Sequence, residues 1–483
     1  MSKFAAYAEF TECSAGYHLL PFRLNPLSGH LYFISNMAGE GYLLERSVLV
    51  DFVHHKLDTN SEIFRDLVSK NFAYTDDSQT FLELLPLKLR TKTSRLQEFT
   101  SLHIFVVTLR CEHSCPYCQV SRQSGDKLAF DMSEDTALRA LSLAFRSPSK
   151  AIKIEFQGGE PLLNFPLIRF VVEEAVRINV TERKDLAFVV TTNLAVITDE
   201  IIDFCRAHDI HISTSLDGPR ELHNANRPRP GNNSYELAVE GIQRCRDQLG
   251  RDRVNALMTT TKRSLGSVIS IIDEYVLLGF EGIFLRPLSP YGFAVKTKWF
   301  ASYDSDEWLK FYREGLDYIV ALNERGFLFK EFMAATILRK MLTPFETGYV
   351  DLMSPAGIGI AAIVYNYDGD VYASDESRML AEMGDKRFCL GNVHASTYDQ
   401  IFTSDALLNA LDESFAYSSP MCTDCAFEPY CGSEPVYHHA TQQDYVGFKP
   451  DSGFCKRSLT VIGYLIDLLN DREKRKILLK WIS

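Results

Sequence analysis

The chain has 483 residues, of which 46% are hydrophobic and 24% charged, proportions ordinary for a globular protein of two or three domains. Its net charge of −12, from 63 acidic and 51 basic residues, would repel a phosphate backbone, so we expect no nucleic-acid partner. No apolar stretch approaches the roughly 20 residues of a membrane span, and MSKFAAYAEF lacks a signal-peptide pattern, so we expect a cytoplasmic protein without membrane contact.

Residues 1–95 read as a separate small α+β module. YHLLPFRL, HLYFISN and GYLLE have the pattern of short strands, and SVLVDFVHHKL and SEIFRDLVSKNF that of helices, the second with Ser61 as N-cap. This order suggests a winged-helix-like module that binds a peptide or only packs on the next domain. The polar stretches TDDSQT and RTKTSR read as linker.

From about residue 100 to 300, apolar strand patterns alternate with amphipathic helix patterns. The expected strands are SLHIFVVTL, AIKIEFQGG, DLAFVVTTN, IHISTSLDG, VNALMTTT and GIFLRPLS. Six such units predict an α/β fold, a partial (β/α)6 TIM-like barrel whose chemistry sits at the carboxyl ends of the strands. We expect residues 301–349 to be a helical connection and 350–483 a cysteine-rich domain.

Seven of the eleven cysteines fall into two groups, which in a reducing compartment indicates metal or redox chemistry. Cys111, Cys115 and Cys118 have the spacing C-x3-C-x2-C after the first barrel strand. Three thiolates can each bind one iron of a [4Fe–4S] cubane and leave the fourth iron open, where the methionine end of S-adenosylmethionine (SAM) could bind. Zinc is the alternative, but His113 lies too close in the loop to complete a tetrahedral site easily.

These motifs resemble those of radical SAM enzymes of the SPASM type, which mature peptides and proteins. The resemblance covers about residues 100–290 and, more weakly, the C-terminal region. It implies reductive cleavage of SAM to a 5′-deoxyadenosyl radical that abstracts hydrogen from a C–H bond, with an external electron donor. It also implies a set of SAM-contacting residues, namely Tyr117, Gly158, Gly159, Glu160, Pro161, Asn193, Ser215 and Arg227.

Within that set, Glu160 would face the SAM ammonium and Arg227 the SAM carboxylate, although Arg227 could equally be a surface arginine. Asp217, in SLDG, reads instead as a turn residue.

The second cysteine group contains Cys422, Cys425, Cys431 and Cys455, and the resemblance implies that it holds one auxiliary [4Fe–4S] cluster. Zinc remains a competitor on ligand count. Ser374 and Pro435 stand where this family carries ligands of a further auxiliary cluster, so we expect that cluster to be absent. Asp375 matches an acid that serves some members as a catalytic proton acceptor, with a turn residue as the alternative.

The segments YFISNMAGEGYLLE, CTDCAFEPYCGSEPVYHHATQQDYVG and KPDSGFCKR most resemble His-Xaa-Ser system radical SAM maturases of the HxsB type. This implies a precursor peptide or small protein with His-Xaa-Ser repeats as partner, alongside a second radical SAM maturase. Two other hypotheses stay open: a radical SAM enzyme acting on a small molecule or RNA, and a non-catalytic, zinc-stabilised peptide-binding scaffold.

Overall fold

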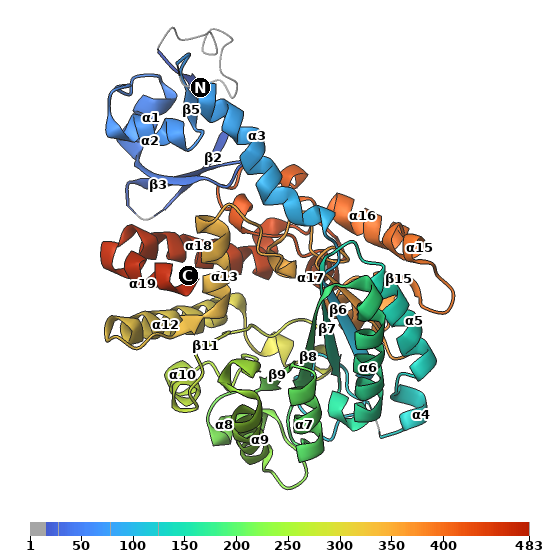
Figure 1. Ribbon diagram of the computed structural model, residues 1–483. Coiled ribbons are helices and arrows are strands. Elements are labelled where there is room, and N and C mark those ends of the chain that lie inside the picture. Colours follow the sequence, from blue (N-terminus) through green and yellow to red (C-terminus); the bar gives the residue numbers. More distant parts are fainter. Residues whose placement is uncertain (1–15, 28, 78, 124, 483) are drawn as a thin grey trace.

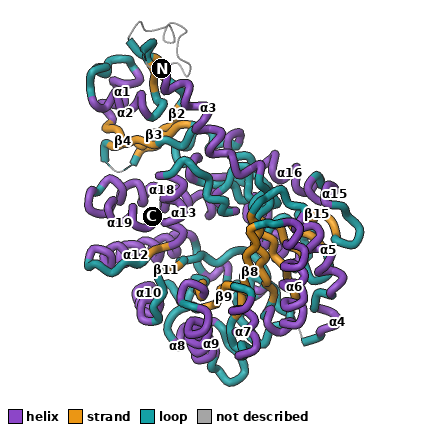
Figure 2. The backbone as a smooth tube through the Cα atoms, in the orientation of Figure 1, coloured by secondary structure: helices purple, strands orange, loops and turns teal. Residues whose placement is uncertain are grey.

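A mixed sheet in the strand order β10-β9-β8-β7-β6-β13-β14-β15 forms the centre of the computed structural model (Figures 1 and 2). The structure describes residues 16–27, 29–77, 79–123 and 125–482. Five neighbouring strands are parallel and follow the chain order, as the alternating pattern predicted. They are β6 (Leu102–Thr108), β7 (Ala151–Gly158), β8 (Asp185–Thr192), β9 (Ile210–Ser215) and β10 (Val254–Leu257).

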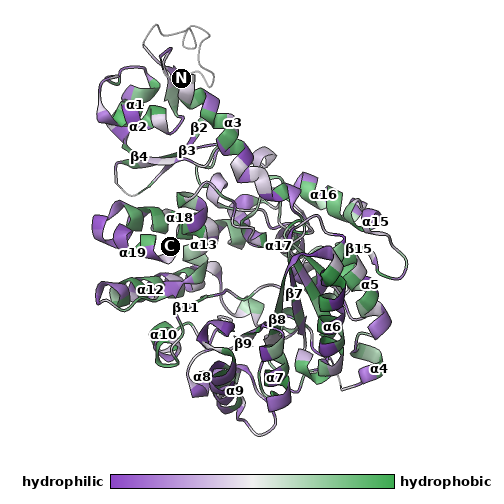
Figure 3. Cartoon of the chain, viewed as in Figure 1, coloured by the Kyte–Doolittle hydropathy of each residue, from purple (hydrophilic) through white to green (hydrophobic). Residues whose placement is uncertain are grey.

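Helices connect these strands and cover the outer face of the sheet (Figure 2). They carry both hydrophilic and hydrophobic residues (Figure 3), because one side packs on the strands and the other meets water. Side-chain caps begin several of them, as at Ser133 and Thr198. The helices are α4 (Lys127–Phe130), α5 (Glu134–Phe145), α6 (Phe165–Glu182), α7 (Asp199–Ala207), α8 (Arg220–Asn226), α9 (Ser234–Leu249) and α10 (Val268–Leu277).

The expected sixth barrel strand differs from the prediction. Only Gly282–Ile283 form a strand, β11, and it pairs with β12 (Lys330–Glu331) in a separate two-stranded sheet. Pro287 and Pro290 follow closely and have no N–H to donate to a strand ladder. The segment 284–292 therefore leaves the sheet and crosses toward the loop that follows β6.

The far edge of the central sheet is built by the C-terminal part of the chain. β13 (Ala362–Tyr365) pairs in parallel with β6, and β14 (Asp370–Tyr372) and β15 (Cys389–Asn392) extend the sheet antiparallel. The remaining helices stand beside and above it (Figure 1). They are α11 (Phe293–Lys296), α12 (Ser305–Glu324), α13 (Phe332–Leu342), α14 (Asp375–Ala381), α15 (Tyr398–Phe402), α16 (Asp405–Glu413), α17 (Pro435–Gln442), α18 (Gly453–Asn470) and α19 (Arg472–Ile482).

The N-terminal module has its own buried core, which includes Ile34, Phe52, Leu67 and Phe72. Four strands precede its helices, a short fifth strand follows them and pairs with β1, and Ser61 caps α2 by accepting from the Phe64 amide at 3.2 Å. The elements are β1 (His18–Leu19), β2 (Phe22–Pro26), β3 (Leu31–Asn36), β4 (Gly41–Glu45), α1 (Arg46–Val53), α2 (Glu62–Ser69) and β5 (Ala73–Tyr74). The sheet β2-β3-β4 is antiparallel.

Of the two stretches expected to be linker, TDDSQT lies mostly before a helix, whereas RTKTSR is helical instead. α3 (Gln79–Thr93) runs from the module to the body of the protein (Figure 1). Its centre, LELLPLKLR, is rich in residues of high helix propensity, which outweigh the polar flanks and Pro86. None of the described helices has the length and apolar character needed to cross a bilayer.

Candidate functional site

The loop after β6 carries Cys111, Cys115 and Cys118 as free, partly exposed thiols. Burial raises the pKa of Cys115 to about 12 and that of Cys111 further still, and the two residues are close enough for their charges to interact. The Cys111 and Cys115 thiols are therefore protonated at neutral pH until a metal displaces the protons.

Backbone contacts hold this loop from several sides. The Ser114 amide donates to the Pro228 carbonyl at 2.8 Å, and the Phe293 amide donates to the Cys118 carbonyl at 2.7 Å. At the base of the loop, the Arg110 guanidinium binds both carboxylate oxygens of Asp131, at 2.7 and 2.8 Å. The three thiols are thus presented by a preorganised loop.

The two glycines that follow β7 pack against the loop itself. A Cβ at Gly158 would lie 1.9 Å from the Thr108 carbonyl oxygen, and one at Gly159 would lie 2.2 Å from that of Arg110. Their small size therefore brings the end of β7 against the end of β6. In the structure, the atoms that both glycines approach most closely belong to the backbone of residues 108–110.

Glu160 follows these glycines and is fully buried. Its carboxylate accepts hydrogen bonds from the Leu162 amide (3.0 Å), the Thr192 hydroxyl (2.7 Å) and the Asn193 amide (2.8 Å). Burial, followed by the charge of Glu112, raises the pKa of Glu160. Pro161 begins the single turn that comes next. Glu160 thus links the carboxyl ends of β7 and β8.

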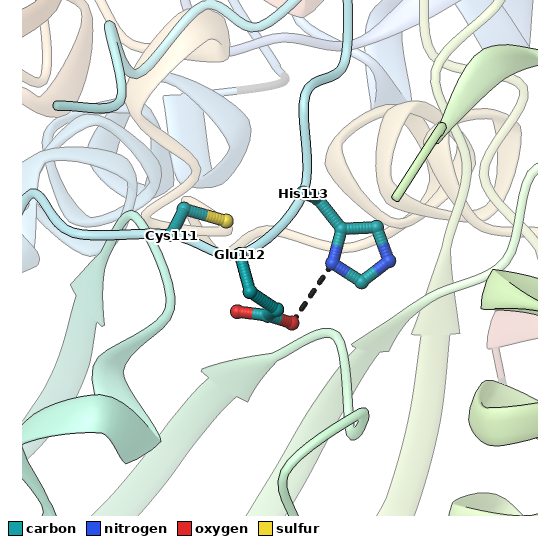
Figure 4. A group of neighbouring side chains, drawn as sticks. All are labelled: Cys111, Glu112 and His113. Atoms are coloured by element: carbon teal, nitrogen blue, oxygen red, sulfur yellow. Dashed lines mark hydrogen bonds and ion pairs between the residues drawn. The ribbon is translucent and has the colours of Figure 1, made fainter. Parts of the chain in front are cut away.

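Glu112 and His113 belong to the same cluster and were not selected from the sequence. The Glu112 Oε1 atom accepts from Asn193 Nδ2 at 2.8 Å and lies 2.8 Å from His113 Nδ1 (Figure 4). Burial opposes ionisation of Glu112, but these hydrogen bonds outweigh it and lower its pKa. Its other oxygen, Oε2, is buried without a hydrogen-bond partner among the described residues. Buried polar atoms are normally hydrogen-bonded, so this oxygen is available to accept a hydrogen bond from a ligand.

Cys111, Glu112 and His113 place one potential ligand atom each within 4.8 Å of one another. No other group of three such residues in the described part of the chain is that tight. His113 is nevertheless not a free ligand, because its Nε2 atom lies 2.7 Å from the Ser234 hydroxyl and its Nδ1 atom contacts Glu112. The histidine orients the loop rather than offering itself to a metal.

Asp217 joins two of the predicted residues. The Tyr117 hydroxyl donates to Asp217 Oδ2 at 2.5 Å, and Arg227 lies 3.1 Å from Asp217 Oδ1. The Arg227 guanidinium also stands 5.6 Å from the centre of the Tyr117 ring. Asp217 is fully buried in the loop that follows β9, and the Arg227 side chain is only 15% exposed, so Arg227 is not a surface arginine. Ser215 ends β9 opposite Leu257 and has no such contact among the described residues.

The C-terminal thiols also gather in space. Cys422, Cys425 and Cys431 lie on one loop, and Cys455 lies in the first turn of α18, whose cap Ser452 accepts from its amide at 3.1 Å. Burial, together with the other three thiols, raises the pKa of Cys425 to about 12. This loop is held by the N-terminal module, through residues 23–35 and Lys92.

Two residues at expected positions of a further cluster have structural roles. Ser374 caps α14 by accepting from the Ser377 amide at 3.2 Å, and Pro435 is the first residue of α17. Asp375 follows Ser374 and lies 3.3 Å from Arg378. It also lines a cavity of about 670 Å³ inside the barrel, together with Lys153, Glu155 and Gln157 of β7.

Residues 105–271 match the family model of the Radical SAM superfamily. An uncharacterised protein of Methanocaldococcus jannaschii is 32% identical over 125 residues, which are 26% of this chain and 41% of that protein. The chain therefore spans less than half the length of that relative. A cysteine-type anaerobic sulfatase-maturating enzyme of Clostridium novyi is 22% identical over 76% of this chain and 96% of its own length.

Two solved structures have a similar fold. Native anSMEcpe with bound AdoMet superposes with a TM-score of 0.63 at 18% identity, covering 77% of this chain and 99% of that one. Streptococcus suis SuiB bound to the precursor peptide SuiA has a TM-score of 0.53 at 14% identity, covering 90% and 98%. The three-thiol loop, its flanking carboxylates and the family match agree with the cofactors expected from the sequence. The chain contains a radical SAM domain, of the family that uses S-adenosylmethionine and a [4Fe–4S] cluster.

Proposed function

We propose that this chain is a radical SAM enzyme that cleaves SAM reductively and modifies a partner peptide or protein. The observation that carries the proposal is the loop of Cys111, Cys115 and Cys118 at the carboxyl end of β6, with buried acidic residues at the ends of the neighbouring strands.

The residues present fit both cofactors. Three unpaired thiols on one braced loop supply three ligands for a four-iron cluster, and no fourth thiol of the described chain shares that loop. The unpartnered Oε2 atom of Glu112 provides an acceptor for a cationic ligand beside them. When bound, the cluster and SAM supply the electron transfer and the 5′-deoxyadenosyl radical.

The protein's own residues would bind SAM and orient it through its ammonium and carboxylate groups. Glu112, Glu160 and Asn193 make a hydrogen-bonded acidic edge suited to the ammonium group of SAM. Asp217 fixes the Arg227 guanidinium, and the Arg227 Nε–H is buried without a partner in the described chain and so remains able to donate to a carboxylate. Gly158, Gly159, Pro161 and Ser215 shape this edge.

We assign the auxiliary cluster to Cys422, Cys425, Cys431 and Cys455. The four thiols lie on one loop and in the first turn of α18, and Cys425 is close enough to the other three for their charges to interact. Four thiolates can bind all four irons of a cubane, as the resemblance implies, and iron analysis separates this cluster from zinc. An auxiliary cluster with four protein ligands would relay electrons or shape the substrate pocket.

The substrate we propose is a precursor peptide or small protein with His-Xaa-Ser repeats, as the resemblance of three segments to the HxsB-type maturases implies. SuiB, whose structure is similar, was solved with a precursor peptide. Asp375 lies in the barrel cavity and would accept the proton released from the substrate. A second radical SAM maturase and an external electron donor complete the system.

Anaerobic purification with iron and sulfide analysis tests the cofactors. We expect about eight irons per chain, from two four-iron clusters, and 5′-deoxyadenosine after addition of SAM and a reductant. Two zinc atoms and little iron would support the zinc-stabilised scaffold instead. Mass spectrometry of a His-Xaa-Ser partner co-expressed with this chain or with its Cys115→Ala variant tests the substrate. An unmodified partner beside active SAM cleavage would favour a small molecule or RNA.

A further inference from the structure

A second cavity, of about 110 Å³, lies beside the barrel cavity, between the segment that follows β11 and the helices α12, α13 and α18. The two cavities share Phe284, Arg286, Asp351 and Glu376 as lining residues. The smaller cavity, which we call the side pocket, is therefore a branch of the space in which a substrate would meet the radical.

The side pocket is joined directly to the thiol loop. Tyr291 lines the pocket, and the next two residues pack on the loop. A Cβ at Gly292 would lie 2.3 Å from the Gln119 carbonyl oxygen, and the Phe293 amide donates to the Cys118 carbonyl. One short segment thus forms both the wall of the pocket and a support of the cluster loop.

Three carboxylates line the side pocket: Asp351, Glu376 and Glu434. Arg286 lies 3.6 Å from Glu376, whereas no described Lys, Arg or His places a nitrogen within 4.0 Å of Asp351 or Glu434. Arg457 also lines the pocket but donates to the Ser305 hydroxyl at 3.2 Å. Burial raises the pKa of all three carboxyl groups, and Glu434 also accepts a hydrogen bond from the Tyr437 amide at 2.8 Å. A cation placed among these groups would therefore favour their ionised forms and be bound by them.

Two polar atoms of the pocket walls have no hydrogen-bond partner among the described residues, Tyr291 Oη and Trp308 Nε1. Their side chains are 1% and 5% exposed. Burial, and then the charges of Glu434, Glu376 and Asp351, raise the pKa of Tyr291, which places its hydroxyl among the three carboxylates. Buried polar atoms are normally satisfied, so these two point to a guest in the pocket.

The guest is larger than a metal ion. No three carboxylates of the described chain bring oxygen atoms within 4.8 Å of one another, so these three are too widely spaced for one ion. The volume is also well above the roughly 10–15 Å³ needed by one water molecule. The other walls are aromatic and aliphatic, formed among others by Phe284, Tyr312, Met333, Ile337, Phe454 and Val461. Such a space suits a hydrocarbon stem with a cationic head.

We infer that the side pocket binds a basic side chain, lysine or arginine, of the peptide substrate, with its cationic head between Asp351 and Glu434. The inference rests on the proposed function, because it takes the guest to be part of a peptide that enters the barrel cavity. It adds a specificity rule: a substrate carries a basic residue near the modified one.

Isothermal titration calorimetry on the anaerobically purified holoprotein tests this. The probes are the blocked tripeptides acetyl-Gly-Lys-Gly-amide and acetyl-Gly-norleucine-Gly-amide, which differ only in the cationic head. We expect the lysine peptide to bind at least about tenfold more tightly, the effect of one charged hydrogen bond. Asp351→Asn and Glu434→Gln keep side-chain shape and should remove most of this preference. Asp412→Asn, at an exposed acid of α16, is the matched control and should retain it.

Equal affinity for the two peptides, absence of binding by either, or a preference that survives both pocket variants would overturn the inference. Thermal melting of each variant identifies one that has unfolded, and the wild-type comparison of the two peptides stands without variants. Formation of 5′-deoxyadenosine in the same wild-type preparation separates the two hypotheses. SAM cleavage without a preference for the lysine peptide would refute only the inference that the side pocket binds a basic side chain. A preference for the lysine peptide without SAM cleavage would refute only the proposed radical SAM activity.

Discussion

Arg23 in the N-terminal module donates to the Thr423 carbonyl at 2.6 Å and forms an ion pair with Glu428 at 2.7 Å. Both of its partners lie on the loop that carries three of the C-terminal thiols. The module also donates from the Ser35 hydroxyl to the Ala426 carbonyl, and Asn25 accepts from the Ala426 amide, both at 2.6 Å. The N-terminal module therefore holds the loop of Cys422, Cys425 and Cys431 in place.

Arg23→Ala should loosen the C-terminal metal site. The change leaves Glu428, whose side chain is only 6% exposed, without its cation, and we expect a loss of about 3 kcal/mol of stability. The iron content per chain after desalting should fall toward that of the cluster on the Cys111–Cys118 loop alone. The melting temperature should also drop. Arg65→Ala, at an exposed arginine of the same module, serves as control. Full iron retention in Arg23→Ala would mean that the brace is dispensable.

Cys115→Ala should abolish SAM cleavage and leave the C-terminal site occupied. Two thiolates cannot hold a cubane that needs three, while the other four cysteines are on separate elements. Production of 5′-deoxyadenosine, followed by chromatography, should disappear, and about half of the iron should remain. Cys389→Ala removes a thiol outside both groups and should cleave SAM at the parental rate. Parental activity in Cys115→Ala would refute the assignment of the loop.

Glu112→Gln should weaken SAM binding by about tenfold or more, because the unpartnered oxygen beside the thiol loop loses its charge while the residue keeps its shape. Equilibrium dialysis with labelled SAM measures this. Glu134→Gln, at an exposed residue of α5, should bind SAM like the parent. An unchanged affinity in Glu112→Gln would show that this carboxylate faces no cation.

His103 should make the fold sensitive to acid. Burial lowers its pKa to about 4 from an ordinary value of 6.5, so the unfolded chain binds this proton more readily than the folded one. The stability it contributes is complete above pH 6.5 and is lost as the pH falls toward 4, by up to about 3 kcal/mol. Denaturant unfolding at pH 7.5 and pH 5 should show a larger loss in the wild type than in His103→Gln. His30→Gln, at an exposed position, should behave like the wild type, and identical losses in His103→Gln would contradict the prediction.

Local sequence patterns were enough to place the candidate site residues on loops at the ends of strands, whereas contacts between distant elements were not predicted. The spacing of Cys111, Cys115 and Cys118, and the position of Glu160 and Asn193 at strand ends, follow from short stretches of sequence. The Asp-Gly pair indicated only a turn at Asp217, because the contacts of Asp217 with Tyr117 and Arg227 depend on the tertiary fold. The expected sixth barrel strand is shortened to β11 because Pro287 and Pro290 follow it, and the apolar pattern of this segment gave no sign of that effect. The side pocket could not be foreseen, since its walls come from residues 284 to 462.

The helix α3 fixes the distance between the N-terminal module and the rest of the protein. α3 has 15 residues and so is about 22 Å long, and the module at its end is fastened a second time through Arg23. If the proposed peptide substrate binds on that module, it starts from a fixed point, and only its residues at one range of distances from that point would reach the candidate site. The length of α3 would then select the modified residue by its distance along the peptide from the binding point.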